Sequence, residues 1–214
     1  MRVEQPIGTK GSLMWLQKSI QNCPELLQPQ SLPAIEWLSP VAADNYAEYR
    51  DIAFLERMGI GHLSQSLNDF WPKRGPQWDA LGRTPEGLVL VEAKAHLKEF
   101  FSSPSAASNT SQNQIQRAFV AVQSDLGVQT SVDWSEVFYQ YANRLTFLWW
   151  LRRNGINAKL LFVSFLNDTE LNGPTVAETW HAAFAAADYA LGLPSRNQLK
   201  KHIHHVMPDV RLIP

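Results

Sequence analysis

A short apolar segment of the chain ends in two oppositely charged residues. Residues 88–94 have the sequence Leu-Val-Leu-Val-Glu-Ala-Lys, so a strand there would place Glu92 and Lys94 on the same face. Both faces of that strand begin apolar, which indicates burial on both sides, and burying a charge without a partner costs free energy. Asp79 stands thirteen residues before Glu92, and a hairpin would bring the two within about 5 Å. The spacing therefore predicts two carboxylates and an ammonium group in one place.

Two carboxylates at one spot repel each other strongly. At about 4 Å and an effective dielectric constant near 20, the repulsion is about 4 kcal/mol, a large part of a domain's net stability. Lys94 supplies one positive charge, and Mg²⁺, for which Mn²⁺ can substitute, would supply two more through oxygen ligands. Such an ion polarises a phosphodiester and lowers the pKa of a bound water, while Lys94 orients or deprotonates the nucleophile. These residue types thus predict metal-assisted hydrolysis of a phosphodiester.

The same residues resemble the signature of the PD-(D/E)XK nuclease superfamily, which has an Asp on one strand and a Glu or Asp, any residue and a Lys on the next. Here the signature residues are Asp79 and Glu92-Ala93-Lys94, although no Pro directly precedes Asp79. The resemblance covers residues 44–166 and implies metal-dependent cleavage of a nucleic-acid backbone. It also implies that Asp79, Glu92 and the carbonyl of Ala93 hold the metal ion, with Lys94 near the attacking water.

Many members of that superfamily also carry a Glu on the first helix, about eleven residues before a Gly that ends the helix. Glu48 stands in that relation to Gly59, and Glu56 is the competing candidate. On a helix, Glu48 would precede Ile52 by four residues and share its core-facing side, where an unpaired carboxylate needs a reason. We therefore expect Glu48 to be the fourth catalytic residue.

A Pro-rich segment just before Asp79 combines cations with aromatic residues. Residues 70–78 set Lys73 and Arg74 between Trp residues and beside Gln77. In a nuclease these cations would hold phosphates while a Trp stacks on a base. A rigid loop whose Trp side chains belong to the core explains the segment equally well.

A polar stripe marks the helix expected over 134–154. It contains Gln140 and Asn143, together with Glu136 and Arg144, on an otherwise apolar surface. In relatives of the resembled fold, the helix after the motif often turns polar residues toward the substrate. Gln140 and Asn143 are therefore candidate nucleic-acid contacts, and solvent exposure is the simpler explanation.

A positively charged run lies near the C-terminus. It consists of Arg196, Lys200, Lys201, His202, His204 and His205. We expect an ordinary solvated surface, with a phosphate-contacting patch as the alternative, since no further ligand is spaced to complete a zinc site with His202 and His205. Cys23 has no neighbouring His and is expected to be a buried thiol, not a nucleophile.

Composition places the chain among ordinary globular proteins. Its 214 residues suit one domain, and 45% hydrophobic residues with eight Trp and ten Phe can fill a large core. The formal net charge is −1, so any contact with nucleic acid must come from a local basic patch. A single cysteine, no apolar leader and no apolar run of roughly 20 residues predict a cytoplasmic protein that does not enter a membrane.

Helical and strand patterns alternate along the chain. The predicted helices cover 44–58, 112–125, 134–154 and 175–191, and the predicted strands cover 77–83, 88–95 and 158–166. Residues 62–71 fit either a helical turn or a short strand, and the Ser-rich and Asn-rich stretch 102–112 is expected to be a loop.

These elements predict one α/β domain with a restriction-endonuclease-like three-layer core, in which helices flank a mixed central β-sheet. Residues 1–43 would form an N-terminal arm, 44–166 the nuclease-like core and 167–214 C-terminal helices.

The motif implies a Mg²⁺-dependent nuclease, and DNA is the expected substrate. One alternative is a nuclease-like fold that has lost catalysis and serves as a binding or assembly module, which the neutral overall charge favours. The other is a metal-dependent hydrolase of a small phosphorylated substrate, which would have a closed apolar pocket. The sequence does not separate DNA from RNA, and it leaves a homodimer open.

Overall fold

A five-stranded β-sheet forms the centre of the computed structural model, which describes residues 1–214. The strands lie in the order β2-β4-β5-β6-β7, with antiparallel pairing from β2 to β5 and parallel pairing from β5 to β7. Their bounds are Glu36–Ser39 (β2), Ala80–Thr84 (β4), Gly87–Lys94 (β5), Ala158–Ser164 (β6) and Ile203–Val206 (β7). The sheet is mixed, as the sequence predicts.

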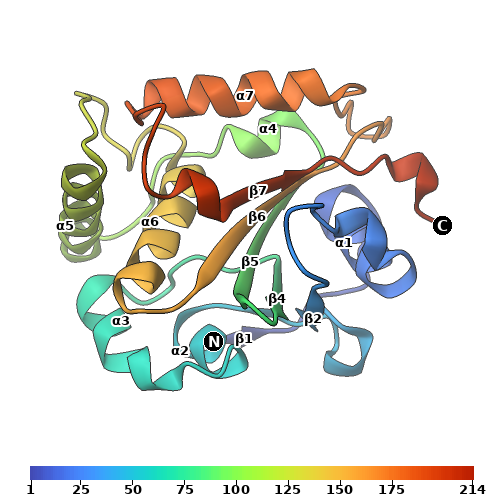
Figure 1. Ribbon diagram of the computed structural model, residues 1–214, viewed down its shortest axis with the longest axis horizontal. Helices are drawn as coiled ribbons and strands as arrows, with labels where there is room; N and C mark the ends of the chain where they lie inside the picture. The colour runs from blue at the N-terminus through green and yellow to red at the C-terminus, as the bar shows by residue number, and fades with distance from the viewer.

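Helices cover both faces of this sheet and give three layers (Figure 1). Helix α1 packs on one face, and the other α-helices pack on the opposite face. The helices span Gly11–Asn22 (α1), Asp51–Arg57 (α2), Ser64–Phe70 (α3), Leu97–Phe100 (α4), Asn109–Leu126 (α5), Tyr139–Arg153 (α6) and Ala177–Ala190 (α7). An α/β architecture with a flanked mixed sheet is therefore confirmed. None of these helices has the length and apolar character that crossing a membrane requires.

Strand β5 separates two hydrophobic cores, because its side chains alternate between the two faces of the sheet. Leu90 packs in the larger core with Phe162, while Val89 and Val91 pack in the smaller core beneath α1. Burial on both faces confirms the prediction for this strand. Glu92 follows Leu90 by two residues, so the alternation places Glu92 on the side of the larger core.

The predicted hairpin is confirmed as β4 and β5. Ala80 pairs with Val91 at the end of the ladder that lies away from the turn. The first strand begins at Ala80 and not at residue 77, because Trp78 pairs with Tyr49 in another part of the chain.

The helix predicted over 44–58 is wrong in its first half. Asn45 and Tyr46 each have a φ of 50°, and Glu48–Tyr49 forms strand β3, which pairs with β1 (Arg2–Val3) in a small second sheet. A distant segment therefore supplies the backbone hydrogen bonds that a local helix would otherwise make. Helix α2 begins only after β3.

Most of the other predicted elements are present. Residues 62–71, which were ambiguous, are mainly helical as α3, and the strand over 158–166 and the helix over 175–191 are confirmed as β6 and α7. The stretch 102–112 is a loop as far as residue 108, and α5 starts at Asn109.

Two helices begin at other residues than predicted. Helix α5 starts one turn early, because the Ser108 Oγ accepts a capping hydrogen bond from the Ser111 N–H at 3.5 Å. Helix α6 starts five residues late, at Tyr139. The Asp133 carboxylate accepts from the Ser135 N–H at 2.7 Å and holds a turn that precedes the helix.

Both ends of the chain contribute strands to the central sheet. Strand β2 comes from the segment 1–43 and lies beside β4, and β7 comes from 167–214 and lies beside β6. The C-terminal segment is thus not only helical, which corrects that expectation. Each of these strands has only four residues, too few for a period of two to stand out in the sequence.

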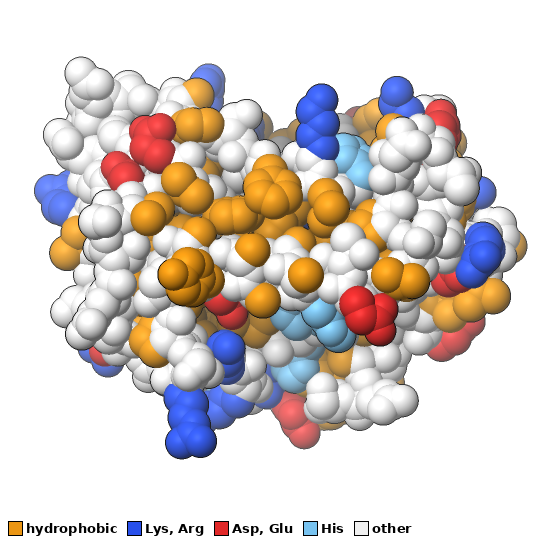
Figure 2. Space-filling view, turned by 90° about the horizontal axis from the view of Figure 1, so that it is seen from above, with side chains coloured by type: hydrophobic (Ala, Val, Ile, Leu, Met, Phe, Trp, Pro, Cys, Tyr) orange, Lys and Arg blue, Asp and Glu red, His pale blue; other side chains and the backbone are white.

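The outward side of α7 carries few charges. Figure 2, which views the molecule from that side, shows an apolar band across its middle with His side chains beside it. Ala182, Ala185 and Ala186 are exposed there, and Tyr189 is 89% exposed. The homodimer that the sequence leaves open stays a prediction.

Candidate active site

Asp79, Glu92 and Lys94 meet at one end of the hairpin. The ladder between β4 and β5 ends at the pair Ala80 and Val91, so Asp79 lies one residue outside it and Glu92 one residue beyond. The Ala93 N–H donates a hydrogen bond to the Asp79 Oδ2 at 2.7 Å across this gap. The hairpin therefore brings the two carboxylates to the same strand ends, as the spacing predicts.

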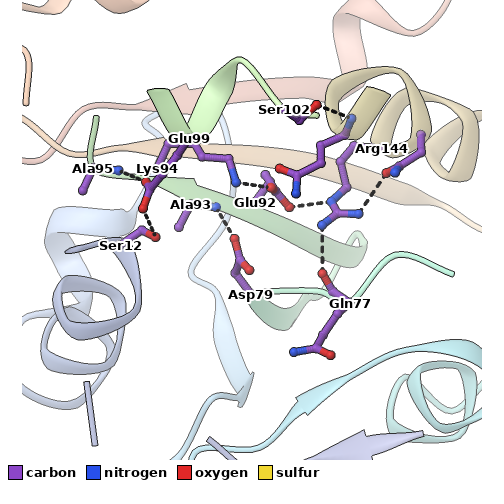
Figure 3. Close-up of polar contacts among 12 residues, drawn as sticks. Ser12, Gln77, Asp79, Glu92, Ala93, Lys94, Ala95, Glu99, Ser102 and Arg144 are labelled. Atoms are coloured by element: carbon purple, nitrogen blue, oxygen red, sulfur yellow. Dashed lines mark hydrogen bonds and ion pairs between the residues drawn. The ribbon is translucent and has the colours of Figure 1, made fainter. Parts of the chain in front are cut away.

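Glu92 is held between two cations (Figure 3). The Lys94 Nζ donates to its Oε1 at 2.6 Å, and the Arg144 Nε donates to its Oε2 at 2.5 Å. The side chains of Glu92 and Arg144 are only 4% and 6% exposed, so little water screens this pair. Both oxygen atoms of Glu92 are thus engaged by positive charge.

Arg144 comes from α6 and connects this helix to the end of the hairpin. It donates to the Gln77 carbonyl oxygen at 2.8 Å and to the Asn143 Oδ1 at 2.9 Å, and it lies over the Trp78 ring at 4.8 Å. The sequence identified Arg144 only as part of a polar stripe. Its position among apolar helix neighbours was the available signal, because a buried cation needs an anionic partner.

Glu48 lies in the site, although on strand β3 and not on a helix. Its side chain is buried, and its Oε2 accepts from the Gln77 Nε2 at 2.6 Å and from the Gln5 Nε2 at 3.0 Å. Glu56 is exposed on α2 and does not line the cleft. Of the two candidates, Glu48 therefore lines the cleft and Glu56 does not. The prediction placed Glu48 on a helix, which is wrong, because it lies on strand β3.

The three carboxylates differ in how their charge is compensated. Burial, and then the charge of Glu92, raise the pKa of Asp79 well above its ordinary value. Burial raises the pKa of Glu48 to about 7. The hydrogen bond from Gln77 opposes this effect, and the nearby charge of Glu92 adds to it. Burial would raise the pKa of Glu92 as well, but Arg144 and Lys94 lower it below its usual range. Asp79 and Glu48 therefore lack the positive partners that Glu92 has.

Lys94 is a charged ammonium group in this arrangement. Burial disfavours its charge, but Glu92 and Asp79 outweigh that effect and raise the pKa of Lys94. Of the cations that line this site, Lys94 and Arg144 pair directly with a carboxylate, and both pair with Glu92.

These residues open onto a polar cleft of about 510 Å³. Of the predicted nucleic-acid contacts, Arg74, Gln77, Gln140 and Asn143 line it, and Lys73 does not. The Gln77 and Asn143 side chains are committed to Glu48 and Arg144, so their first role is to hold the site together. The full lining is Glu48, Arg50, Arg74, Gly75, Pro76, Gln77, Asp79, Glu92, Lys94, Ser102, Ser103, Pro104, Tyr139, Gln140, Asn143 and Arg144.

The predicted metal ligands offer the donor type that Mg²⁺ prefers, but they are not joined by a cluster of further ligands. No three His, Cys, Asp or Glu side chains are grouped so that they could share an ion. The donor atoms are nevertheless of the right kind, because Asp79, Glu92 and the Ala93 carbonyl offer only oxygen. Asp79 accepts a single hydrogen bond and makes no ion pair of its own. The donor type therefore fits Mg²⁺, and Arg144 is already bound to Glu92, one of the predicted ligands.

The weaker candidates of the sequence lie elsewhere. His205 stacks on Phe162 and packs against Phe184, whereas the His204 Nδ1 lies 2.9 Å from the Ser31 Oγ. Alternation along β7 directs these two His side chains to opposite faces of the sheet. Cys23 is buried, as expected, and burial raises the pKa of its thiol.

Comparison of the chain with protein-family models, with curated proteins and with solved structures found no match. The resemblance to the PD-(D/E)XK superfamily therefore stays a prediction from the sequence.

Proposed function

We propose that this chain is a metal-dependent nuclease of the PD-(D/E)XK type with a restriction-endonuclease-like core. The observation that carries the proposal is the meeting of Asp79, Glu92 and Lys94 at two adjacent strand ends beside an open polar cleft. A phosphodiester substrate is anionic and extended, which suits such a cleft. DNA is the expected nucleic acid.

Each side chain has a distinct chemical task in this proposal. Asp79, Glu92 and the Ala93 carbonyl would hold Mg²⁺, which supplies Lewis-acid stabilisation of the charge that develops on the phosphate. Lys94 is charged, so it orients the attacking water and stabilises negative charge, which favours the first of its two expected roles. Glu48, whose pKa lies at about 7, is able to accept a proton near neutral pH.

One alternative has a specific observation in its favour. Both oxygen atoms of Glu92 are engaged by Lys94 and Arg144, as expected of a structural ion-pair network in a binding module that has lost catalysis. The small-substrate hydrolase has less support, because the cleft is open and polar, not a closed apolar pocket.

Cleavage assays test the proposal directly. Plasmid, linear duplex, single-stranded DNA and RNA are each incubated with Mg²⁺, Mn²⁺ or EDTA. The wild type is compared with Lys94→Ala and with Lys98→Ala, a matched control at an exposed position on α4. We expect metal-dependent cutting by the wild type and Lys98→Ala, and a loss of about 100-fold or more in Lys94→Ala. If the folded wild type cuts none of these substrates, the binding-module alternative takes its place.

A further inference from the structure

A second hollow of about 400 Å³ lies next to the cleft and shares Arg74 and Tyr139 with it. We infer that the two hollows form one groove, which takes a single strand of nucleic acid between the segments 71–76 and 102–108. The inference rests on the proposed nuclease function and names the substrate class of the same site.

Both walls of this groove are fixed by hydrogen bonds. On one side, the Gly75 N–H donates to the Asp51 Oδ1 at 2.9 Å. On the other side, the Ser102 Oγ accepts from the Gln140 N–H at 3.0 Å, a contact drawn in Figure 3. The Ser105 N–H donates to a backbone carbonyl just before α6 at 2.8 Å. Two loops from distant parts of the chain are thus anchored on either side of the same path.

The two hollows differ in the charge of their lining residues, and only the cleft contains acidic side chains. The acidic residues gather at the hairpin end, where the scissile phosphate would lie. The second hollow has no acidic lining residue, and it contains Lys73, Arg74 and the hydroxyl groups of three Ser residues. Lys73 and Arg74 are exposed, and neither takes part in an ion pair. Both cations are therefore free to contact the neighbouring phosphates.

Three features favour a single strand over a duplex. A duplex carries one negative charge per roughly 1.7 Å and calls for a broad basic face, whereas the net charge of this chain is −1. The unpaired cations Lys73 and Arg74 lie in a path that loops border on both sides. Tyr139 lines both hollows and is partly exposed, and it offers a ring on which an unpaired base can stack.

Fluorescence anisotropy tests this inference without any catalysis. The probes are a labelled DNA strand of about 12 nucleotides, an RNA of the same sequence and the matching DNA duplex, each with EDTA and with Ca²⁺. We expect a single strand to bind at least about tenfold tighter than the duplex. The double variant Lys73→Gln with Arg74→Gln is expected to lose about tenfold in single-strand affinity. Arg196→Gln with Lys201→Gln removes the same charge at exposed positions of the C-terminal run and is expected to change little.

The binding and cleavage results together test the single-strand groove separately from the nuclease activity. Equal or tighter binding of the duplex, an equal loss in the C-terminal variant, or no binding by folded protein overturns the inference. Single-strand binding that depends on Lys73 and Arg74 but comes without cleavage overturns the nuclease and leaves the groove. Cleavage and binding confined to duplex DNA leave the nuclease and overturn the groove.

Discussion

Glu92 depends on cations from two different elements, Lys94 on its own strand and Arg144 on α6. Removing one partner of a buried ion pair leaves an uncompensated charge, so Arg144→Met should lower the free energy of unfolding by about 3 kcal/mol in metal-free buffer. Asp79→Asn removes a carboxylate from the same crowded site and keeps an acceptor for the Ala93 N–H, so its stability should be unchanged or higher. Urea unfolding in EDTA measures both variants. A drop in Asp79→Asn as large as that in Arg144→Met would mean that Asp79 is a structural ion-pair member.

Glu48 should make the stability of the protein depend on pH. Its pKa is about 7 in the folded protein and near 4.5 in the unfolded chain, so the folded state binds the additional proton between these values. Its stabilising effect is complete below pH 4.5 and is lost as the pH rises through 7, by about 3 kcal/mol in total. Glu48→Gln cannot titrate, so the loss between pH 5 and 7 should shrink in urea unfolding with EDTA. Parallel curves for wild type and variant would assign the pH dependence to other groups.

Residue types and spacing predicted that the acidic residues meet, but they did not predict that Arg144 balances the charge of Glu92. Asp79, Glu92 and Lys94 are linked by a short hairpin, so their meeting could be predicted from a local pattern. Arg144 stands 52 residues after Glu92, and a local sequence pattern cannot predict that α6 directs this side chain toward the end of the strand. The roles of Gln77 and Asn143 depend on the same tertiary contacts.

Among the elements, the turn between β4 and β5 makes a close contact that can be tested. A Cβ atom on Gly87, whose φ is +148°, would lie 1.9 Å from the Asn157 carbonyl oxygen, which also accepts from the Leu88 N–H at 2.9 Å. Gly87→Ala should therefore lower the free energy of unfolding by more than about 2 kcal/mol. Gly127, at the end of α5, has a φ of +68° and open space around it, so Gly127→Ala should cost only about 1 kcal/mol. Urea unfolding compares the two, and equal losses would contradict the close approach at Asn157.

Local signals decided which elements could be predicted from the sequence. The hairpin has Pro and Gly in its turn and β-branched residues in its second strand, so pattern and structure agree. The helix over 44–58 failed because Val3 pairs with Glu48 across 45 positions of the chain, which a helical period cannot reveal. Strands β2 and β7 were not predicted for a related reason, since each is short and gains its stability from a neighbouring strand.

At the scale of the whole molecule, the N-terminal segment joins three parts of the structure. Strand β2 forms the edge of the central sheet beside β4, and β1 pairs with β3. Leu16 on α1 and Leu27 pack in the smaller core against β5 and β6. Gln5 donates to Glu48 in the candidate active site. A segment with this many partners differs from an arm that rests on a finished domain.

Deletion of residues 1–43 should therefore prevent cooperative folding of the remaining chain. The deletion uncovers one face of β5 and β6 and leaves β4 as an unpaired edge, and exposed apolar strands favour aggregation. Leu16→Ala in the full chain is the milder control and should lower the free energy of unfolding by about 3 kcal/mol while the protein stays folded. Circular dichroism and thermal unfolding measure both. If the deletion variant keeps a sharp unfolding transition, residues 44–214 fold as an independent unit. The prediction that residues 1–43 are an arm packed on a finished domain would then be correct.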